Sequence, residues 1–292
     1  MRKEKEAPQK MSKRRRNIAG IITVTAALAA GVAAQPAAAD LPFDPSTLVT
    51  LTSNQANHPT GLNYTLVIPQ TSGADELATA DLKKAIVQLP RGMTVDPGAG
   101  ANLGSCTSAE FGVHTSGATQ CPTNSILGDV TVTTPLLTRS LSGHIFLARQ
   151  FDNPFNTLFA IYLEVIDEQD GIEIKLPGRI DLDPNFGILT TTFDDNPQLP
   201  FDHLFIQLHT LGGGPLVTPP CGSYGLKTTL FSWAQPDVAV PLSSPFTIST
   251  GCAATRSQGL ALSNSTGLPT ALNVNRIMGK NSKKKKHHRS RG

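Results

Sequence analysis

The strongest constraint on the fold is the pattern after residue 40, where short alternating runs of apolar and polar residues are separated by Gly, Pro, Asn and Asp. Alternation with a period of two places one face of a strand in a core and the other in water. Residues 60–69 follow this pattern and stop at Pro69. Further runs of the same kind occupy 84–89, 126–134, 144–148, 157–165, 172–182, 188–193, 203–209, 222–233 and 245–251.

Helical signals are short. Residues 75–82 have a pattern for one or two turns, and Thr107 and Glu110 have the spacing of a capping box, which begins a helix. No longer run with a 3.6-residue period follows residue 40, which argues against an α/β fold. The sequence therefore predicts an all-β fold: an antiparallel β-sandwich of about ten strands, immunoglobulin-like or related, with one or two short helices.

The N-terminal segment 1–39 has the features of a signal peptide. The basic run 13–16 precedes an uncharged, Ala-rich stretch from Ile18 to Ala34, and 37–39 is Ala-Ala-Ala. Small residues at this place favour cleavage before Asp40. The alternative is an uncleaved N-terminal helix that anchors the protein, and either Met1 or Met11 fits as the start. We expect secretion or an extracytoplasmic cell-surface location.

After this segment, residues 40–253 are expected to form the β-sandwich domain. A division near residue 135 into two subdomains is an alternative. Residues 254–292 are rich in Ser, Thr and Asn and then become basic, which predicts a disordered tail.

Four cysteines fit an oxidising compartment. Three pairings are conceivable. Local pairing of Cys106 with Cys121 and of Cys221 with Cys252 is favoured, because each bridge would close a short loop beside strand-like segments. No Cys-x-x-Cys motif is present and no histidine lies within four residues of a cysteine, which argues against zinc.

Charge is unevenly distributed along the chain. Residues 40–275 carry nine Lys/Arg against twenty Asp/Glu, whereas 276–292 carry eight Lys/Arg and no acid. An acidic body argues against a nucleic-acid-binding domain. A basic tail favours either passive solubility or adhesion to anionic envelope polymers or lipid headgroups, at about 1 kcal/mol for each basic residue near an anionic surface. The residues of this tail site are Lys283, Lys284, Lys285, Lys286, Arg289 and Arg291.

Candidate chemical sites are weak. Asp181, Asp183 and Asn185 place oxygen ligands at alternate positions, as in a calcium loop, although Gly187 comes one residue late and a hairpin turn explains the same residues. Asp194 and Asp195 are adjacent, so on a strand end they would point to opposite faces and not form an acid/base pair. His203 and His209 would be about 20 Å apart on one strand, too far to share a metal. We predict no catalytic residues and no cofactor.

Three blocks resemble a known group of proteins. Residues 56–63 (ANHPTGLN), 89–97 (LPRGMTVDP) and 193–201 (FDDNPQLPF) are similar to blocks in exported β-rich modules of high-GC Gram-positive bacteria. The resemblance covers about residues 48–252 and includes the placement of the four cysteines. It implies an extracytoplasmic structural or surface role and assigns no functional residues.

These observations predict a non-catalytic exported module of the cell surface or envelope that interacts with polymers, lipids or other proteins. The alternative is a carbohydrate-binding or glycan-hydrolysing protein. Carbohydrate-binding faces use exposed aromatic side chains, and this chain has one Trp and three Tyr.

Overall fold

A computed structural model describes residues 41–70, 79–101, 103–113, 115–167, 169–209 and 214–252. The predicted signal peptide, the basic tail and residues 75–78 of the predicted helix at 75–82 lie outside these ranges. Within them, no helix has the length and apolar character needed to cross a membrane.

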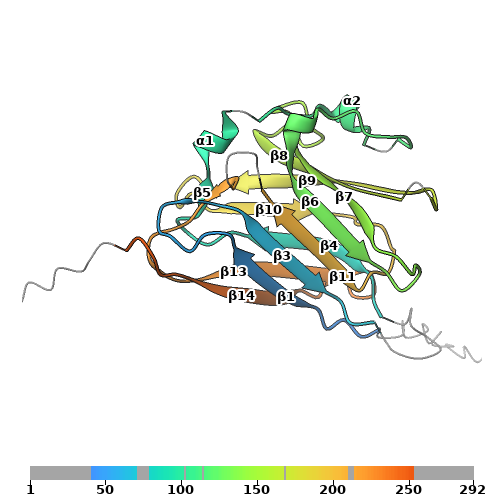
Figure 1. The fold of residues 1–292 in the computed structure, drawn as a ribbon. Coiled ribbons are helices and arrows are strands. Elements are labelled where there is room, and N and C mark those ends of the chain that lie inside the picture. Colours follow the sequence, from blue (N-terminus) through green and yellow to red (C-terminus); the bar gives the residue numbers. More distant parts are fainter. Residues whose placement is uncertain are drawn as a thin grey trace, which may run out of the picture.

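Two antiparallel sheets contain the strands (Figure 1). The large sheet has eleven strands in the order β1-β3-β11-β6-β7-β8-β9-β10-β4-β13-β14, and the small sheet has the order β2-β12-β5. The large sheet comprises β1 (Ser46–Leu51), β3 (Leu62–Val67), β4 (Leu82–Gln88), β6 (Ile126–Thr133), β7 (Leu141–Leu147), β8 (Phe159–Asp167), β9 (Ile172–Leu182), β10 (Leu189–Phe193), β11 (His203–Leu208), β13 (Gly222–Ser232) and β14 (Val240–Ile248). The small sheet comprises β2 (Pro59–Thr60), β5 (Thr94–Val95) and β12 (Leu216–Val217).

The predicted all-β antiparallel fold is confirmed, and the structure refines its layering. Figure 1 shows β3, β11 and β6 crossing in front of β10, β4 and β13, as two layers of a sandwich would. The layers are not separate sheets, because β7, β8 and β9 join them through continuous strand pairing. Strands from both sides of residue 135 are neighbours in this sheet, since β4 lies between β10 and β13.

The two edge strands of the large sheet meet each other. The hydroxyl oxygens of Thr47 on β1 and Ser244 on β14 are 2.8 Å apart. Just beyond the strand ends, Gln55 and Thr250 form a parallel bridge. The sheet therefore curls until its first and last strands lie side by side, and its concave face becomes an interior.

The strand bounds follow the alternating pattern closely. β9 spans the predicted 172–182, and the turn after it is stabilised by Asp183, whose Oδ1 accepts a hydrogen bond of 2.8 Å from the Asn185 amide. Gly187 closes this turn with φ of 65°, a conformation that costs glycine least. The last strand differs from its prediction, because β14 begins at Val240 and ends at Ile248.

Other local predictions differ more. Residues 79–81 are not helical, and β4 begins at Leu82. Helix α1 (Pro97–Gly100) and the 3-10 helix η1 (Thr123–Ser125) were not predicted. Helix α2 (Ser108–Phe111) confirms the capping box, since the Glu110 amide donates to the Thr107 hydroxyl and the Thr107 amide donates to the Glu110 carboxylate. The two hydrogen bonds from Thr107 also lower the pKa of Glu110.

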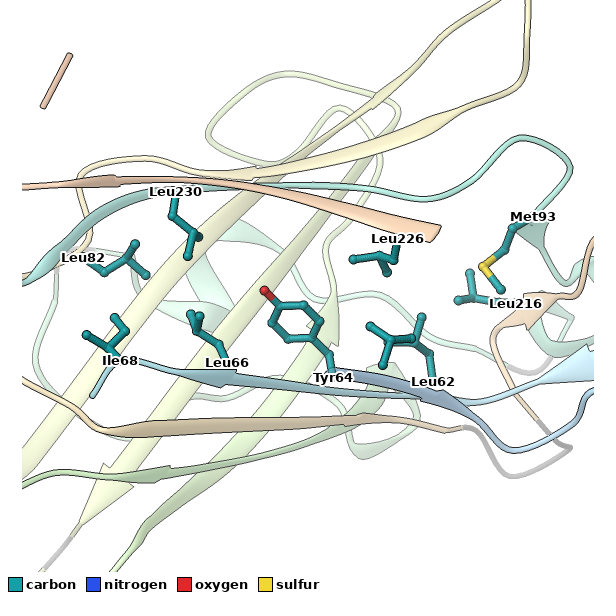
Figure 2. Packing of buried hydrophobic residues seen from close by; sticks show 10 residues of the cluster. Leu62, Tyr64, Leu66, Ile68, Leu82, Met93, Leu216, Leu226 and Leu230 are labelled. Carbon is teal, nitrogen blue, oxygen red and sulfur yellow. The ribbon is translucent and has the colours of Figure 1, made fainter. Parts of the chain in front are cut away.

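The main core lies where β3 faces β13 (Figure 2). Tyr64 stands between the two strands, and its hydroxyl is 3.3 Å from that of Thr228. Burial raises the pKa of Tyr64 to about 12. The cluster is otherwise almost wholly aliphatic, which is the composition that stabilises a closely packed sheet interior. Its remaining members are Val49, Leu62, Leu66, Ile68, Leu82, Met93, Leu216, Leu226 and Leu230.

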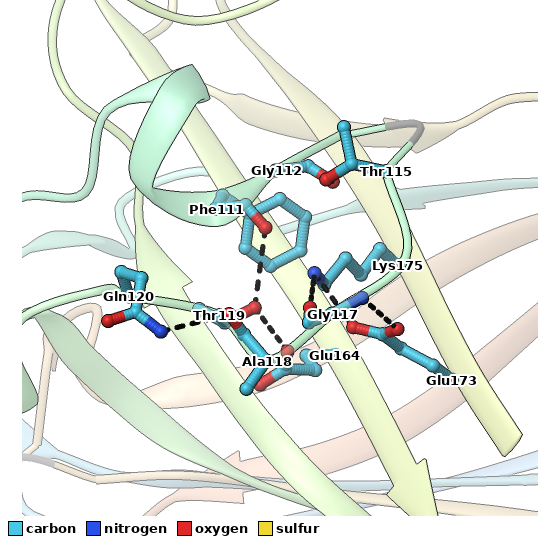
Figure 3. A network of polar contacts seen from close by, with 10 residues as sticks. All are labelled: Phe111, Gly112, Thr115, Gly117, Ala118, Thr119, Gln120, Glu164, Glu173 and Lys175. Atoms are coloured by element: carbon cyan, nitrogen blue, oxygen red, sulfur yellow. Dashed lines mark hydrogen bonds and ion pairs between the residues drawn. The ribbon is translucent and has the colours of Figure 1, made fainter. Parts of the chain in front are cut away.

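The loop from Cys106 to Cys121 covers the outer face of β7 and β8. Phe111 on α2 stacks on Tyr162 of β8 with ring centroids 4.2 Å apart. Figure 3 shows the polar contacts at the margin of this cluster. Lys175 on β9 donates to the Gly117 carbonyl at 2.6 Å and pairs with Glu173 at 2.8 Å. The loop is therefore fixed to the sheet by an aromatic cluster and a charged network.

Candidate functional site

The most distinctive feature of the interior is an apolar cavity of about 570 Å³ between the two layers. Its walls are the inward-facing residues of the strands. On β9, Ile172, Ile174 and Leu176 line the cavity, whereas the alternate residues Glu173 and Lys175 make the outer network described above. The period of two along the strand therefore produces an aliphatic inner wall and a charged outer surface.

The cavity exists because the inner faces are only partly packed. Val130, Ile145 and Val165 form a buried cluster on one side of the curl, and the main core forms another. Between them, inward residues such as Val87 and Ile174 remain half-buried. Apolar side chains that face an unfilled space lose packing contacts, so an apolar molecule that fills the space would restore them.

The cavity is elongated. Leu127 and Thr134 both line it, and they are seven residues apart along β6 and its end, about 23 Å at the rise of an extended strand. We call its two ends the α1 end, where Val95 and Leu103 line it, and the Asn196 end, formed by the connections after β6 and β10.

Apolar lining residues reach the surface at both ends. Val95 is 45% exposed at the α1 end, and Leu136 is 54% exposed at the Asn196 end. A volume in the range of about 300–1,000 Å³ with an apolar lining is typical of small-molecule sites. The geometry therefore suits a long apolar group.

Few polar groups interrupt the lining. Asp96 caps α1 by accepting a hydrogen bond of 2.9 Å from the Gly98 amide, and the Thr134 hydroxyl donates to the Pro200 carbonyl at 2.7 Å. The Tyr64 hydroxyl already has a hydrogen-bond partner in the Thr228 hydroxyl. In the described part of the chain, no hydrogen-bond partner is found for the side chains of Thr191 and Asn196, which also line the cavity.

The four predicted disulfide residues lie away from the cavity walls. The structure joins Cys106 to Cys121 and Cys221 to Cys252. Both bridges lie at the α1 end of the sheet, where they close loops that follow or precede strands. Two disulfides fit an oxidising, extracytoplasmic environment.

The calcium candidates have structural roles. Asp181 pairs with Arg179 at 3.0 Å, and Asp183 accepts hydrogen bonds from the Asn185 and Phe186 amides. These contacts are those of a hairpin turn. Across the described ranges, no group of three or more His, Cys, Asp or Glu residues is arranged to hold a metal ion.

The other predicted candidates do not converge. Asp194 pairs with Lys84 at 2.8 Å, whereas Asp195 adopts a left-handed turn with φ of 51°. His203 lies near Asp202, at 3.7 Å, while His209 contacts Asp129 at 2.7 Å. The basic residues of the tail, from Lys283 to Arg291, lie outside the described residues.

One polar cluster was not predicted. Asp129 lies between two histidines on the outer surface: its Oδ1 is 2.9 Å from His144 and its Oδ2 is 2.7 Å from His209. The hydrogen bond from His209 is the main reason that the pKa of Asp129 is lowered. The three residues come from different strands or strand ends, so only the register of β6, β7 and β11 brings them together.

A buried carboxylate under the first disulfide loop was also missed. Glu164 on β8 is 5% exposed and accepts a hydrogen bond from the Thr119 hydroxyl. This contact connects the sheet to the loop segment before Cys121, as Figure 3 shows. Because its partner belongs to the covering loop, Glu164 has a structural role in docking that loop.

No protein-family model matches the sequence, and no curated protein matches it.

Proposed function

We propose that this chain is a non-catalytic, exported binding protein of the cell surface or envelope whose interior takes an elongated apolar ligand. The cavity carries the proposal. It is preformed, it is lined mostly by apolar side chains, and its lining reaches the surface at both ends. A ligand with a hydrocarbon chain would gain about 0.8 kcal/mol for each methylene group that it buries.

Export is supported by the signal-like segment 1–39 and by the two disulfides. The resemblance to exported β-rich modules of high-GC Gram-positive bacteria agrees with this location. In the same proposal, the basic tail brings the protein to anionic envelope polymers or lipid headgroups. A cavity for apolar chains would then act close to a source of lipids.

The carbohydrate alternative has less support. The exposed phenylalanines of the described residues come from separate elements: Phe151 follows β7, Phe186 follows β9 and Phe205 lies on β11. The Arg91 guanidinium already lies over the Phe186 ring, with its Cζ 5.1 Å from the ring centroid. These exposed phenylalanines therefore do not form the row of free aromatic rings on which a sugar would stack.

The test is binding of an alkyl-chain fluorophore to purified, oxidised protein. We expect its emission to shift as it enters the cavity and dodecanol to displace it. Thr191→Trp fills the cavity from β10 and should abolish binding. Thr190→Trp is the matched control, because it places the same side chain on the outer face of the same strand.

Urea unfolding of both variants establishes that they are folded. If the folded wild-type protein fails to bind the fluorophore, or if Thr191→Trp binds as well as Thr190→Trp, the proposed site is wrong. Binding of full-length protein and of protein lacking residues 276–292 to anionic vesicles in a salt series tests the tail, and equal binding by both would remove its proposed role.

A further inference from the structure

We infer that the ligand is a single-chain amphiphile with an uncharged, hydrogen-bonding head group, and that the side-chain amide of Asn196 binds this head. The inference rests on the proposed function, since it assigns the chemistry and orientation of a molecule in the same cavity. It comes from one unpartnered polar side chain and from the charge at that end of the sheet.

Asn196 is held in place through its backbone. Its backbone N–H donates to the Lys83 carbonyl at 2.9 Å, and its backbone carbonyl accepts a hydrogen bond of 3.0 Å from the Trp233 indole. Asp195, in a left-handed conformation, begins this turn. These two hydrogen bonds, to β4 and to the residue after β13, leave the backbone of Asn196 little freedom, which is the preorganisation that a binding group needs.

The Asn196 side chain has unused hydrogen-bonding capacity. The residue is only 7% exposed and lines the cavity, yet no partner for its amide is found within the described ranges. Its Oδ1 and Nδ2 atoms are still reached by solvent, so a ligand group inside the cavity can form hydrogen bonds with them. Thr191 also lacks a partner, but it is half-buried on β10 and farther inside the wall.

The charge around Asn196 selects against an anionic head. The connections at this end carry Asp167 and Asp170, which share Arg139, as well as Asp194 and Asp195. Lys84 is engaged by Asp194, and Lys83 lies over the Trp233 ring at 5.0 Å. Among the described residues at this mouth, carboxylates therefore outnumber the cations that are not already engaged. An alcohol, ester or amide head is compatible with this field, whereas a carboxylate or phosphate head is repelled.

The tail would lie toward the α1 end. From Asn196 the lining continues through Phe193 and Ile206 to Leu127 and Leu216, all apolar. Among the described residues that line the far end, Asp96 is the one carboxylate, and it already accepts a hydrogen bond from the Gly98 amide. The cavity thus offers a free polar group near one mouth and a long hydrocarbon wall behind it, which matches a monoacyl amphiphile in one orientation.

Three probes of equal chain length test the head group: dodecanol, 1-chlorododecane and dodecanoate, each displacing the alkyl fluorophore. For the wild-type protein we expect the affinity order dodecanol, then 1-chlorododecane, then dodecanoate. Loss of one hydrogen bond in Asn196→Leu should weaken dodecanol binding about tenfold. Binding of 1-chlorododecane should not change.

Two variants control for folding. Gln198→Leu removes an exposed amide from the same connection without touching the cavity and should bind like the wild type. Asn196→Ser retains a hydrogen-bonding hydroxyl and should keep most of the preference for dodecanol. Raising the salt concentration should reduce the disadvantage of dodecanoate, because the repulsion is electrostatic.

The outcomes separate this inference from the proposed function. If none of the probes displaces the fluorophore, the cavity proposal itself fails. If all bind but Asn196→Leu weakens dodecanol and 1-chlorododecane equally, or if dodecanoate binds best, the cavity proposal stands and the role of Asn196 is wrong.

Discussion

Thr47 and Ser244 link the two edges of an eleven-stranded sheet: their hydroxyl oxygens are 2.8 Å apart, although they belong to the first and last strands in its order. Ser244 is 1% exposed, so its hydroxyl depends on this neighbour rather than on water. The contact closes the curl that creates the cavity.

Replacing Thr47 with Val should therefore destabilise the protein. The change leaves the buried Ser244 hydroxyl without its partner, at a cost of about 1–3 kcal/mol. Urea unfolding measures the effect, and Ser46→Ala, at an exposed position of the same strand, is the control. Adding Ser244→Ala to the Thr47 variant should recover part of the loss; a double variant that is no better than the single one would contradict this explanation.

The first disulfide loop should loosen when Lys175 is replaced with Met. Lys175 donates to Gly117 in the loop and pairs with Glu173 on the sheet, and its side chain is 5% exposed. Loss of these charge-assisted contacts should weaken docking of the loop by about 2 kcal/mol. Hydrogen exchange of residues 107–121 reports this opening. Lys227→Met, on an exposed position of β13, should leave it unchanged.

Removal of the Cys106–Cys121 bridge should lower global stability. The bridge spans 15 residues, and a loop of this length corresponds to about 3 kcal/mol from restriction of the unfolded chain. A Cys106→Ala/Cys121→Ala variant, compared by urea unfolding with the oxidised wild type, measures the difference. In this variant, a reducing agent should cause little further opening of the loop. A large further opening would show that the Cys106–Cys121 bridge is not what stabilises it.

The Asp129 cluster should make stability depend on pH in acid. The two histidines lower the pKa of the Asp129 carboxyl in the folded protein relative to the unfolded chain. The ionised Asp129 carboxylate therefore adds to the free energy of unfolding at pH values above the ordinary aspartate pKa. This stabilisation is lost as the pH falls through the lowered pKa of the folded protein. Asp129→Asn should be less stable than the wild type at neutral pH, and the difference should close in acid.

Urea midpoints measured across this range test the prediction. The matched control is Asp237→Asn, an exposed aspartate in the β13–β14 connection. A constant difference between Asp129→Asn and the wild type at all pH values would show that titration of Asp129 is not its cause.

The sequence predicted strands best where alternation is strict. β9 has aliphatic residues at every second position, and its predicted bounds are those of the structure. β1 was missed because its inner face presents Thr47 beside Val49, while Leu48 points outward and is 61% exposed. Its apolar residues therefore do not share one face, and the partner that makes Thr47 favourable is almost two hundred residues away.

The cavity could not be predicted in the same way. The inward positions of β4 and β9 follow from their pattern, but the gap between their faces depends on how far the sheet curls. That curl is set by pairings between distant segments, such as β4 with β13. Similarly, the availability of Asn196 follows from its surroundings in three dimensions, since Asn-Pro in a sequence indicates only a turn.

The meeting of β1 and β14 has a further consequence for behaviour in solution. A free edge strand exposes unpaired amides and carbonyls, which can recruit another chain and start aggregation. Here each edge of the large sheet lies against the other, so neither is presented to a neighbouring molecule. The curl that encloses the cavity thus also protects the protein from self-association at high concentration.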